Sequence, residues 1–281
     1  MEYTVGVVNS EDGMRLSGIM SGKKGIIMGI ANERSIAWGI AQACHAAGAD
    51  MMLTYQSDVL LKRLEPLAES IGTDFLSHCD FDDISTVDKT FDMIAEKWGY
   101  LDFLVHAIAY SERDDLRGRY VDTSRDNFLR SLDISCYSFT SVARRCEPLM
   151  KDKGGSLLAM TYYGAEKVIP HYNVMGVAKA ALESSVRYLA SDLGPNNIRV
   201  NALSAGPMKT LASSAIGQFN YTLKWNKLNA PLKRLNTQED VGKAALYLLS
   251  DMSSAVTAEI HHVDCGYNSN GMRREDSVGL V

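Results

Sequence analysis

A tyrosine and a lysine in the stretch IPHYNVMGVAKA, residues 169–180, have types and spacing that suit acid catalysis. If this segment is helical, Tyr172 and Lys179 are nearly two turns apart and share one face, roughly 10 Å apart along the axis. A phenol can donate a proton, and a nearby cation lowers its pKa and eases that donation. Pairs with this spacing are also common on ordinary helices, so the surrounding elements must decide between the two interpretations.

Short apolar segments alternate with longer helix-like segments along most of the chain. The segments expected to be strands are KGIIMGI, ADMMLTY, DFLSHCD, LDFLVHAIA, GSLLAMTYY, IRVNALSAGP and EIHHVDCGY. Helices are expected between them, including one long stretch near 124–151 and one that contains Tyr172 and Lys179. This alternation is typical of a parallel sheet covered on both faces. No Pro- or Ser-rich linker divides the chain. The sequence therefore predicts one doubly wound α/β domain of Rossmann type over 1–281, with about seven strands.

Composition and charge exclude several classes of function. The 281 residues are 46% apolar and 22% charged, as expected for a globular protein with a sizeable core, and the net charge of −5 argues against a nucleic-acid binder. No signal peptide is expected, because the N-terminus lacks a basic start followed by an apolar run, and no membrane-spanning segment is expected, because no stretch approaches about eighteen apolar residues. The cysteines have no metal-binding or CxxC spacing, which predicts reduced thiols in a cytoplasmic protein and no metal site; they are Cys44, Cys79, Cys136, Cys146 and Cys265.

The first strand–helix turn, GIANERSIAWG, does not match the usual G-x-G-x-x-G pattern of dinucleotide-binding folds. Gly29 leaves the strand, and Ser35 is suited to cap the next helix or to contact a phosphate at its N-terminus. Small side chains at Ser35 and Ala37 would let the backbone approach a ligand. By itself the turn fits a plain capped helix equally well.

The end of the second strand, TYQSD, bears on the choice of cofactor. Gln56 stands where NAD-binding folds usually carry an acidic residue for the adenosine ribose, and an amide can bind ribose hydroxyls as well. A 2′-phosphate would need an adjacent cation, but Ser57 and Asp58 follow, and Asp58 would repel it. Lys62 and Arg63 lie one to two turns further along and weaken this argument. NADH is favoured over NADPH.

The third strand ends in CDFDD, which offers contacts for an adenine ring. Asp80 can accept a hydrogen bond from the adenine amino group while Phe81 flanks the ring. The same residues fit an ordinary polar strand end equally well.

The catalytic residues of short-chain dehydrogenases are a Tyr-x3-Lys on the helix after the fifth strand and an earlier serine. The literal match here, Tyr163 to Lys167, is predicted to lie in a loop, because it contains Gly164 and is followed by VIP. Counting back from Lys179 instead places Met175 at the usual tyrosine position. The serine position, thirteen residues earlier, holds Tyr162, and Tyr172 is expected one turn before Met175 on the same helix face.

This rearranged set resembles the bacterial enoyl-acyl-carrier-protein reductases of fatty acid synthesis, a divergent branch of the short-chain dehydrogenases. The Tyr-x9-Tyr-x6-Lys spacing of Tyr162, Tyr172 and Lys179 is its most diagnostic part. The resemblance runs roughly from Ser21 to Tyr267 and includes IMGIANERSIAWGIA, LTYQSD, CDFDD, FLVHAIAYS, LDISCYSFT, TYYGAEKVIPHYNVMGVAKAALE, VNALSAGPMKTLAS and EDVGKAALYLLSD. It implies NADH-dependent reduction of the trans-2 double bond of enoyl thioesters.

The resemblance also implies roles for individual residues. The turn after the first strand would hold the pyrophosphate, Lys179 the nicotinamide ribose, and the start of the segment after the sixth strand the carboxamide and phosphates. The implied cofactor contacts are Gly29, Ser35, Ile36, Gln56, Asp80, Phe81, Ile108, Lys179, Met208, Lys209, Thr210, Leu211 and Ala212. The implied substrate contacts are Ser111, Tyr162, Met175, Ile216 and Phe219.

The chemistry of this reduction agrees with these residue types. Hydride addition to the β-carbon leaves negative charge on the thioester oxygen, which needs a hydrogen-bond donor. A phenol, with a reference pKa of about 10, is a neutral donor at physiological pH, and Lys179 would lower that pKa while it binds the ribose. We assign enolate stabilisation to Tyr172, and positioning of the thioester or support of the donor to Tyr162.

The segment MKTLASSAIGQFNYTLKWNKLNAPLKR, residues 208–234, interrupts the alternation. It follows a strand end, where open parallel sheets bind ligands. Its start spaces four residues as one apolar helix face, namely Leu211, Ala215, Ile216 and Phe219. This face either packs permanently on the core or forms a lid over an acyl groove floored by Tyr162 and Met175. The small residues, with Gly217 among them, and the benefit of excluding water favour the lid, ordered only with ligands.

The resemblance implies an acyl carrier protein bearing the enoyl thioester as partner, and a homotetramer. Basic residues for the acidic carrier protein are frequent on the lid helix of the family, but here GQFNY has none, and Lys224 and Lys227 come later. Cys265 stands where the family usually has glycine. The alternatives are a 3-ketoacyl or alcohol reductase, which would require the usual serine and tyrosine, and a non-catalytic NAD-binding module.

Overall fold

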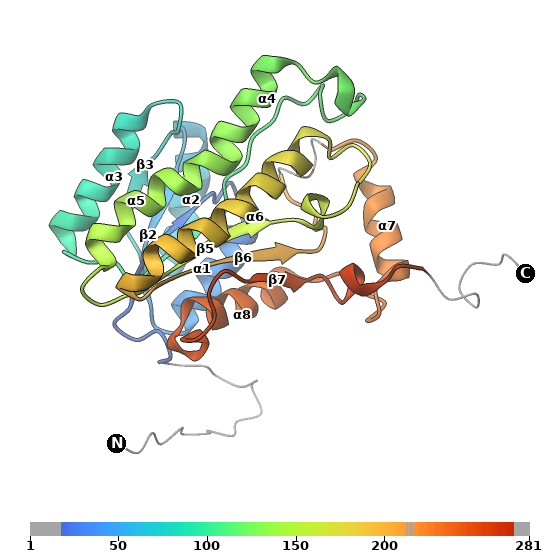
Figure 1. Ribbon diagram of the computed structural model, residues 1–281. Coiled ribbons are helices and arrows are strands. Elements are labelled where there is room, and N and C mark those ends of the chain that lie inside the picture. The colour runs from blue at the N-terminus through green and yellow to red at the C-terminus, as the bar shows by residue number, and fades with distance from the viewer. Residues whose placement is uncertain (1–17, 212, 214–215, 273–281) are drawn as a thin grey trace, which may run out of the picture.

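A seven-stranded parallel sheet between two layers of helices forms the body of the molecule (Figure 1). The computed structural model describes residues 18–211, 213 and 216–272. The strands are β1 Lys24–Met28, β2 Asp50–Tyr55, β3 Leu76–His78, β4 Phe103–His106, β5 Gly155–Thr161, β6 Ile198–Ala205 and β7 Ile260–Val263. They are arranged in the order β3-β2-β1-β4-β5-β6-β7. The predicted fold class and each of the predicted strands are confirmed.

Each face of the sheet has its own apolar core. The helices are α1 Ile36–Ala46, α2 Asp58–Ser70, α3 Ile84–Lys97, α4 Arg125–Leu132, α5 Ser138–Met150, α6 Val174–Leu193, α7 Phe219–Asn229 and α8 Gln238–Leu249. Helices α1, α2 and α8 pack on one face, and α3, α5 and α6 on the other. Successive strand residues point to opposite faces, so Ile27 enters the first core and Ile26 and Met28 the second. The strands are therefore apolar throughout instead of alternating.

The stretch predicted as one long helix near 124–151 is helical but contains an irregular turn. Between α4 and α5, residues Asp133–Tyr137 form a π-helical turn, which the periodicity of the sequence does not reveal. Ser124 caps α4 by accepting a hydrogen bond from the Asn127 amide. Turns of this kind inside helices often mark functional sites.

The order in which successive strands are placed across the sheet reverses at its middle, between β1 and β4. From β1 the chain moves outward through β2 and β3, and from β4 it continues to β5, β6 and β7 on the other side. Open parallel sheets bind ligands outside the carboxyl ends of their strands at such a switch point.

The segment 208–234 differs from its prediction. Its described helix, α7, begins only at Phe219, after Gln218, whose φ of 52° cannot belong to a right-handed helix. Leu211 and Phe219 therefore do not share one helix face as predicted, and Ala215 lies outside the described residues. In the described part of the chain, no helix is long and apolar enough to cross a membrane.

Candidate active site

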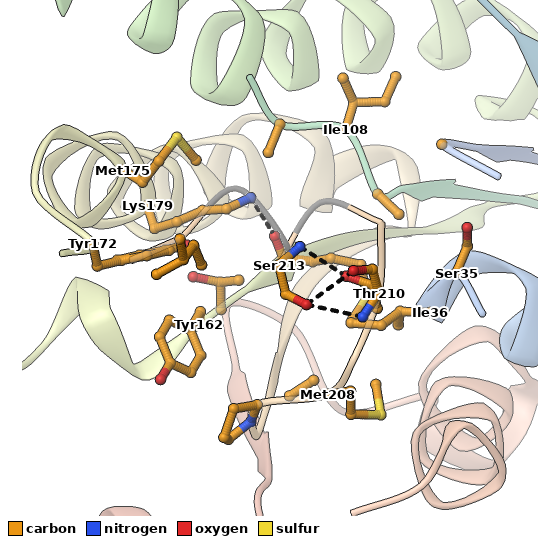
Figure 2. Close-up of a pocket in the computed structure, with 18 of the residues that line it drawn as sticks. Ser35, Ile36, Ile108, Tyr162, Tyr172, Met175, Lys179, Met208, Thr210 and Ser213 are labelled. Carbon is orange, nitrogen blue, oxygen red and sulfur yellow. Dashed lines mark hydrogen bonds between the residues drawn. The ribbon is translucent and has the colours of Figure 1, made fainter. Parts of the chain in front are cut away.

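A cavity of about 340 Å³ opens at the carboxyl edge of the sheet, beside the switch point. Its walls come from the ends of β1, β4, β5 and β6, the start of α6 and the segment after β6. Figure 2 shows Ser35 and Ile36 on one side, Tyr172, Met175 and Lys179 on the opposite side, and Thr210 and Ser213 between them.

Most of the residues predicted for the site line this one cavity. They are Gly29, Ser35, Ile36, Ile108, Ser111, Tyr162, Tyr172, Met175, Lys179, Met208, Thr210, Ile216 and Phe219. Five predicted residues do not line it, namely Gln56, Asp80, Phe81, Lys209 and Leu211, and Ala212 lies outside the described residues. The literal Tyr163–Lys167 pair lies in a short turn and the loop after it, as predicted, and is not part of the lining.

The two tyrosines pack against each other on the cavity wall. The rings of Tyr162 and Tyr172 meet edge to face, with centroids 4.9 Å apart at an angle of 76°. Tyr172 is only 8% exposed and packs in a small apolar cluster with Leu116 and Met175.

The prediction that Tyr172 and Lys179 share one helix face is wrong. Helix α6 begins at Val174, so Tyr172 belongs to the turn that precedes the helix, and only Lys179 belongs to the helix itself. Both side chains nevertheless line the same cavity. The turn before α6, and not the helix, therefore places the Tyr172 phenol in the cavity wall.

Lys179 is almost fully buried at the end of β5. Its Nζ donates a hydrogen bond to the Met160 carbonyl oxygen at 2.7 Å. Burial lowers the pKa of Lys179 to about 8, because removing a charged ammonium from water is unfavourable. The lysine is thus held by backbone at the cavity wall, with a proton that it can lose in the mildly alkaline range.

Burial raises the pKa of both Tyr162 and Tyr172 well above the ordinary value of a phenol. The neighbouring Tyr162 and Glu183 raise the pKa of Tyr172 further. The expectation that Lys179 lowers the pKa of the catalytic tyrosine is therefore not met in this structure, because burial outweighs any help from the cation. Both phenols stay protonated at neutral pH, as a hydrogen-bond donor must be.

The turn after β1 is shaped by a glycine and a serine. Gly29 has a φ of 97°, and a Cβ there would stand 2.2 Å from the Ala107 carbonyl oxygen, so only glycine fits. Ser35 precedes α1, but its side chain makes no capping hydrogen bond, contrary to one of its two predicted uses. Its Oγ instead accepts hydrogen bonds from the amides of Ala31 and Asn32, at 3.0 and 3.1 Å, which fixes the loop that lines the cavity.

The residues predicted for the adenosine lie together further along the carboxyl edge. Gln56 Nε2 donates to Asp80 Oδ1 at 3.2 Å, and the same oxygen accepts from the Asp82 amide at 3.1 Å. Phe81 meets the ring of His106 edge to face, with centroids 6.3 Å apart. The structure thus brings together residues from the ends of β2 and β3, outside the main cavity.

Some lining residues were missed by the sequence reasoning. Met160 and Thr161 end β5 directly before Tyr162, so their position at a strand end was a usable signal. Leu116 and Ser213 lie in segments without regular periodicity, and no motif indicated them. Thr210 and Ser213 exchange hydrogen bonds in a tight turn, with Ser213 N donating to Thr210 Oγ1 at 3.1 Å.

The strand order, the cavity at the switch point and a buried lysine beside two tyrosines define a reductase of the short-chain dehydrogenase type. The sequence profile described as enoyl-(acyl carrier protein) reductase matches residues 29–268. The chain belongs to this enoyl-acyl-carrier-protein reductase family.

Relatives of the chain are similar over nearly their whole length. An NADH-dependent enoyl-acyl-carrier-protein reductase of Rhizobium meliloti is 64% identical over 94% of this chain and 97% of that protein. The crystal structure of the Anaplasma phagocytophilum reductase in complex with NAD is 59% identical, with a TM-score of 0.89 over 93% of this chain and 100% of that chain. A Bacillus cereus reductase solved with NADP+ and indole naphthyridinone is 45% identical, with a TM-score of 0.88 over 90% and 99%.

Proposed function

We propose that this cavity reduces the trans-2 double bond of enoyl thioesters on an acyl carrier protein, with NADH as reductant, in fatty acid synthesis. The observation that carries the proposal is the convergence of Tyr162, Tyr172 and Lys179 on one cavity, in a chain of this family. The close relatives named as NADH-dependent reductases support the same activity.

The residues around the switch point fit a nicotinamide dinucleotide. The Gly29 turn and the loop fixed by Ser35 give a closely approachable backbone for a pyrophosphate, and Lys179 and Thr210 offer polar groups to the nicotinamide half. When bound, NADH supplies the hydride for the β-carbon of the substrate. Lys179 would hold the ribose, and Ile108, Met208 and Thr210 would border the nicotinamide.

The adenosine side favours NADH over NADPH. Gln56 and Asp80 hydrogen-bond each other at this end of the site, and Asp58, two residues after Gln56, begins α2. Arg130, a cation near this edge, is already paired with Asp82 at 2.7 Å. The acidic surroundings would repel a 2′-phosphate, although the Bacillus cereus relative was solved with NADP+.

The protein's own residues then stabilise the charge that develops on the substrate. Tyr172 donates a hydrogen bond to the thioester oxygen, and its high pKa keeps the proton on the phenol until charge develops. Tyr162, in contact with the Tyr172 ring, positions the thioester. Leu116, Met175 and Ile216 form an apolar wall for the acyl chain and exclude water.

The chain is one catalytic domain in which the segment 208–234 covers the acyl groove. Met208, Thr210, Ser213, Ile216 and Phe219 all line the cavity, which supports this role. We also expect a cytoplasmic protein that assembles as a homotetramer. Exposed apolar side chains on neighbouring helical elements support the assembly, namely Leu129, Tyr137 and Tyr188, which expose 47%, 56% and 74% of their surface. Light scattering tests the assembly, and a monomer at micromolar concentration would contradict it.

The activity itself is tested by the loss of NADH absorbance with two substrates. The purified chain should oxidise NADH with crotonyl thioester and not with acetoacetyl thioester. Turnover only with the keto substrate would favour a 3-ketoacyl reductase, and NADH binding without any turnover would favour a binding module.

A further inference from the structure

The proposed catalytic residue, Tyr172, is flanked by two residues with positive φ, His171 and Asn173. Before it, Pro170 and His171 occupy the centre of a turn closed by the Tyr172 amide, which donates to the Ile169 carbonyl at 3.1 Å. His171 has a φ of 64°, as the third residue of a type II turn requires. After it, Asn173 has φ 43° and ψ −123°.

The conformation of Asn173 is that of the first central residue of a type II′ turn. The turn is closed by a hydrogen bond from the Met175 amide to the Tyr172 carbonyl at 3.0 Å. Glycine is the ordinary residue at this position, because a side chain there is strained. Backbone strain of this kind persists only where the surrounding structure holds it, and it gathers at functional sites. The asparagine side chain should therefore have a use that glycine cannot supply.

The side chain of Asn173 clamps the neighbouring loop that carries Leu116. Its Nδ2 donates to the carbonyl oxygens of Asp115 at 2.7 Å and Gly118 at 3.0 Å. Both partners are acceptors, so the amide nitrogen and not the amide oxygen must face them. The two carbonyls lie on either side of Leu116 in the sequence, so the clamp fixes the backbone that carries this leucine.

Leu116 connects the clamp to the reacting part of the site. It is 5% exposed and packs with Tyr172 and Met175. Its carbonyl also accepts a hydrogen bond from the Gly217 amide at 3.5 Å, which ties the loop to the segment that covers the cavity. Through the loop of Leu116, Asn173 thus connects the turn that carries Tyr172 with the apolar wall and with the segment that covers the cavity.

We propose that Asn173 is a positioning residue that fixes the Tyr172 hydroxyl relative to the Leu116 wall, and so sets its distance to the substrate oxygen. This inference rests on the proposed role of Tyr172. Asparagine combines tolerance of positive φ with an amide that donates two hydrogen bonds. Glycine would keep the backbone and lose the clamp, and aspartate would keep the shape but turn carboxylate oxygens toward two carbonyls.

The test compares Asn173→Gly and Asn173→Asp with the unaltered chain in the enoyl-thioester assay. A misplaced donor lowers kcat/KM by about 10- to 100-fold, mainly through kcat, because orientation at the reacting atoms is lost. The affinity for NADH, measured by titration, should stay unchanged, because the clamp lies on the acyl side. Asn197→Gly is the matched control: Asn197 also has positive φ, at 56°, but lies at the amino edge of the sheet, and its replacement should leave kcat/KM unchanged.

A double-mutant cycle separates positioning from a general structural role. If Asn173 acts through the phenol, Asn173→Gly should cost much less in a Tyr172→Phe background than in the unaltered chain. Full kcat/KM in Asn173→Gly, or an equal loss in both backgrounds, would overturn the inference while leaving the proposed function in place. An unchanged rate in Tyr172→Phe alone would instead remove the assigned role of Tyr172, and the inference with it. Melting temperatures of all variants show whether each one is folded.

Discussion

At the scale of single residues, the site depends on burial that acts in opposite directions on two kinds of group. Burial raises the pKa of Tyr172 and lowers that of Lys179 to about 8, because each group is driven toward its neutral form. A neutral phenol is the form that donates to a developing enolate, whereas a neutral amine weakens the hold on a ribose. The two residues should therefore fail in different ways when they are altered.

Replacement of the phenol should affect turnover and not cofactor binding. Tyr172→Phe removes the donor to the thioester oxygen but keeps the ring that packs on Tyr162 and Leu116. Loss of such a donor lowers kcat by about 10²–10³. Steady-state kinetics with crotonyl thioester, together with NADH titration, measure both quantities. Full activity in this variant would shift the donor role to Tyr162.

Replacement of the lysine should affect binding first. Lys179→Met removes a polar group from the ribose side and a hydrogen bond to Met160, so the affinity for NADH should fall. In the unaltered chain the affinity should also weaken as pH rises through about 8, where Lys179 loses its proton. The assigned role of Lys179 would be contradicted by unchanged NADH affinity in Lys179→Met. It would also be contradicted if the NADH affinity of the two proteins depended on pH in the same way.

The lowered pKa of Lys179 also predicts how the stability of the fold changes with pH. Its pKa of about 8 in the folded chain lies below the reference value of 10.5, so the unfolded state holds the proton more tightly. The buried charge destabilises the fold below pH 8, and this penalty is relieved as pH rises from about 8 toward 10.5. Relative to Lys179→Met, the unaltered chain should gain stability across that range, by up to about 3 kcal/mol. Denaturant unfolding at several pH values measures the difference.

At the scale of elements, strands and helices could be read from the sequence and the turns between them could not. Apolar runs and helical periodicity were enough for all seven strands, because both faces of a parallel sheet are buried. The site was found through the spacing of Tyr162, Tyr172 and Lys179. The start of α6, however, depends on positive φ at His171 and Asn173, and Asn173 is held by hydrogen bonds to Asp115 and Gly118, far away in sequence.

The backbone of the segment after β6 should become more protected from solvent when ligands bind. We expect amide hydrogen exchange at 209–211 and 216–220 to slow when NAD and an acyl mimic bind together, because the segment then closes on both ligands. The backbone amides of α8 serve as an internal reference. Equal, strong protection with and without ligands would make the segment a fixed part of the core.

At the scale of the whole molecule, charge is distributed unevenly. The chain has 34 acidic and 29 basic residues, yet between Pro207 and Gln238 there are five basic residues and no acidic one. Within this range α7 exposes Tyr221, Trp225 and Leu228 by 56%, 45% and 48% of their surface, next to the exposed Lys224 and Lys227. This face begins at the cavity, where Phe219 lines the wall, and its charge complements an acidic carrier protein.

The charge of α7 predicts how the carrier protein is recognised. The double variant Lys224→Glu with Lys227→Glu should raise KM for a carrier-protein thioester about tenfold or more, because like charges then repel. The KM for the corresponding coenzyme A thioester should change little, since that substrate needs only the cavity. Lys151→Glu, at the end of α5 on the opposite edge, is the control. Equal effects on both substrates would place carrier recognition elsewhere.

The strand order has a consequence for how the chain folds as it is made. Strands β1, β2 and β3 can pair as soon as they emerge, but β1 must leave its other edge open until β4 arrives, when Gly25 pairs with Phe103. From there each new strand adds beside the last, through β5, β6 and β7. The cavity draws on the ends of β1, β4, β5 and β6 and on Phe219, so it is completed only after most of the sheet has assembled. A nascent chain can thus hold a growing, native-like sheet long before it has anywhere to bind a substrate.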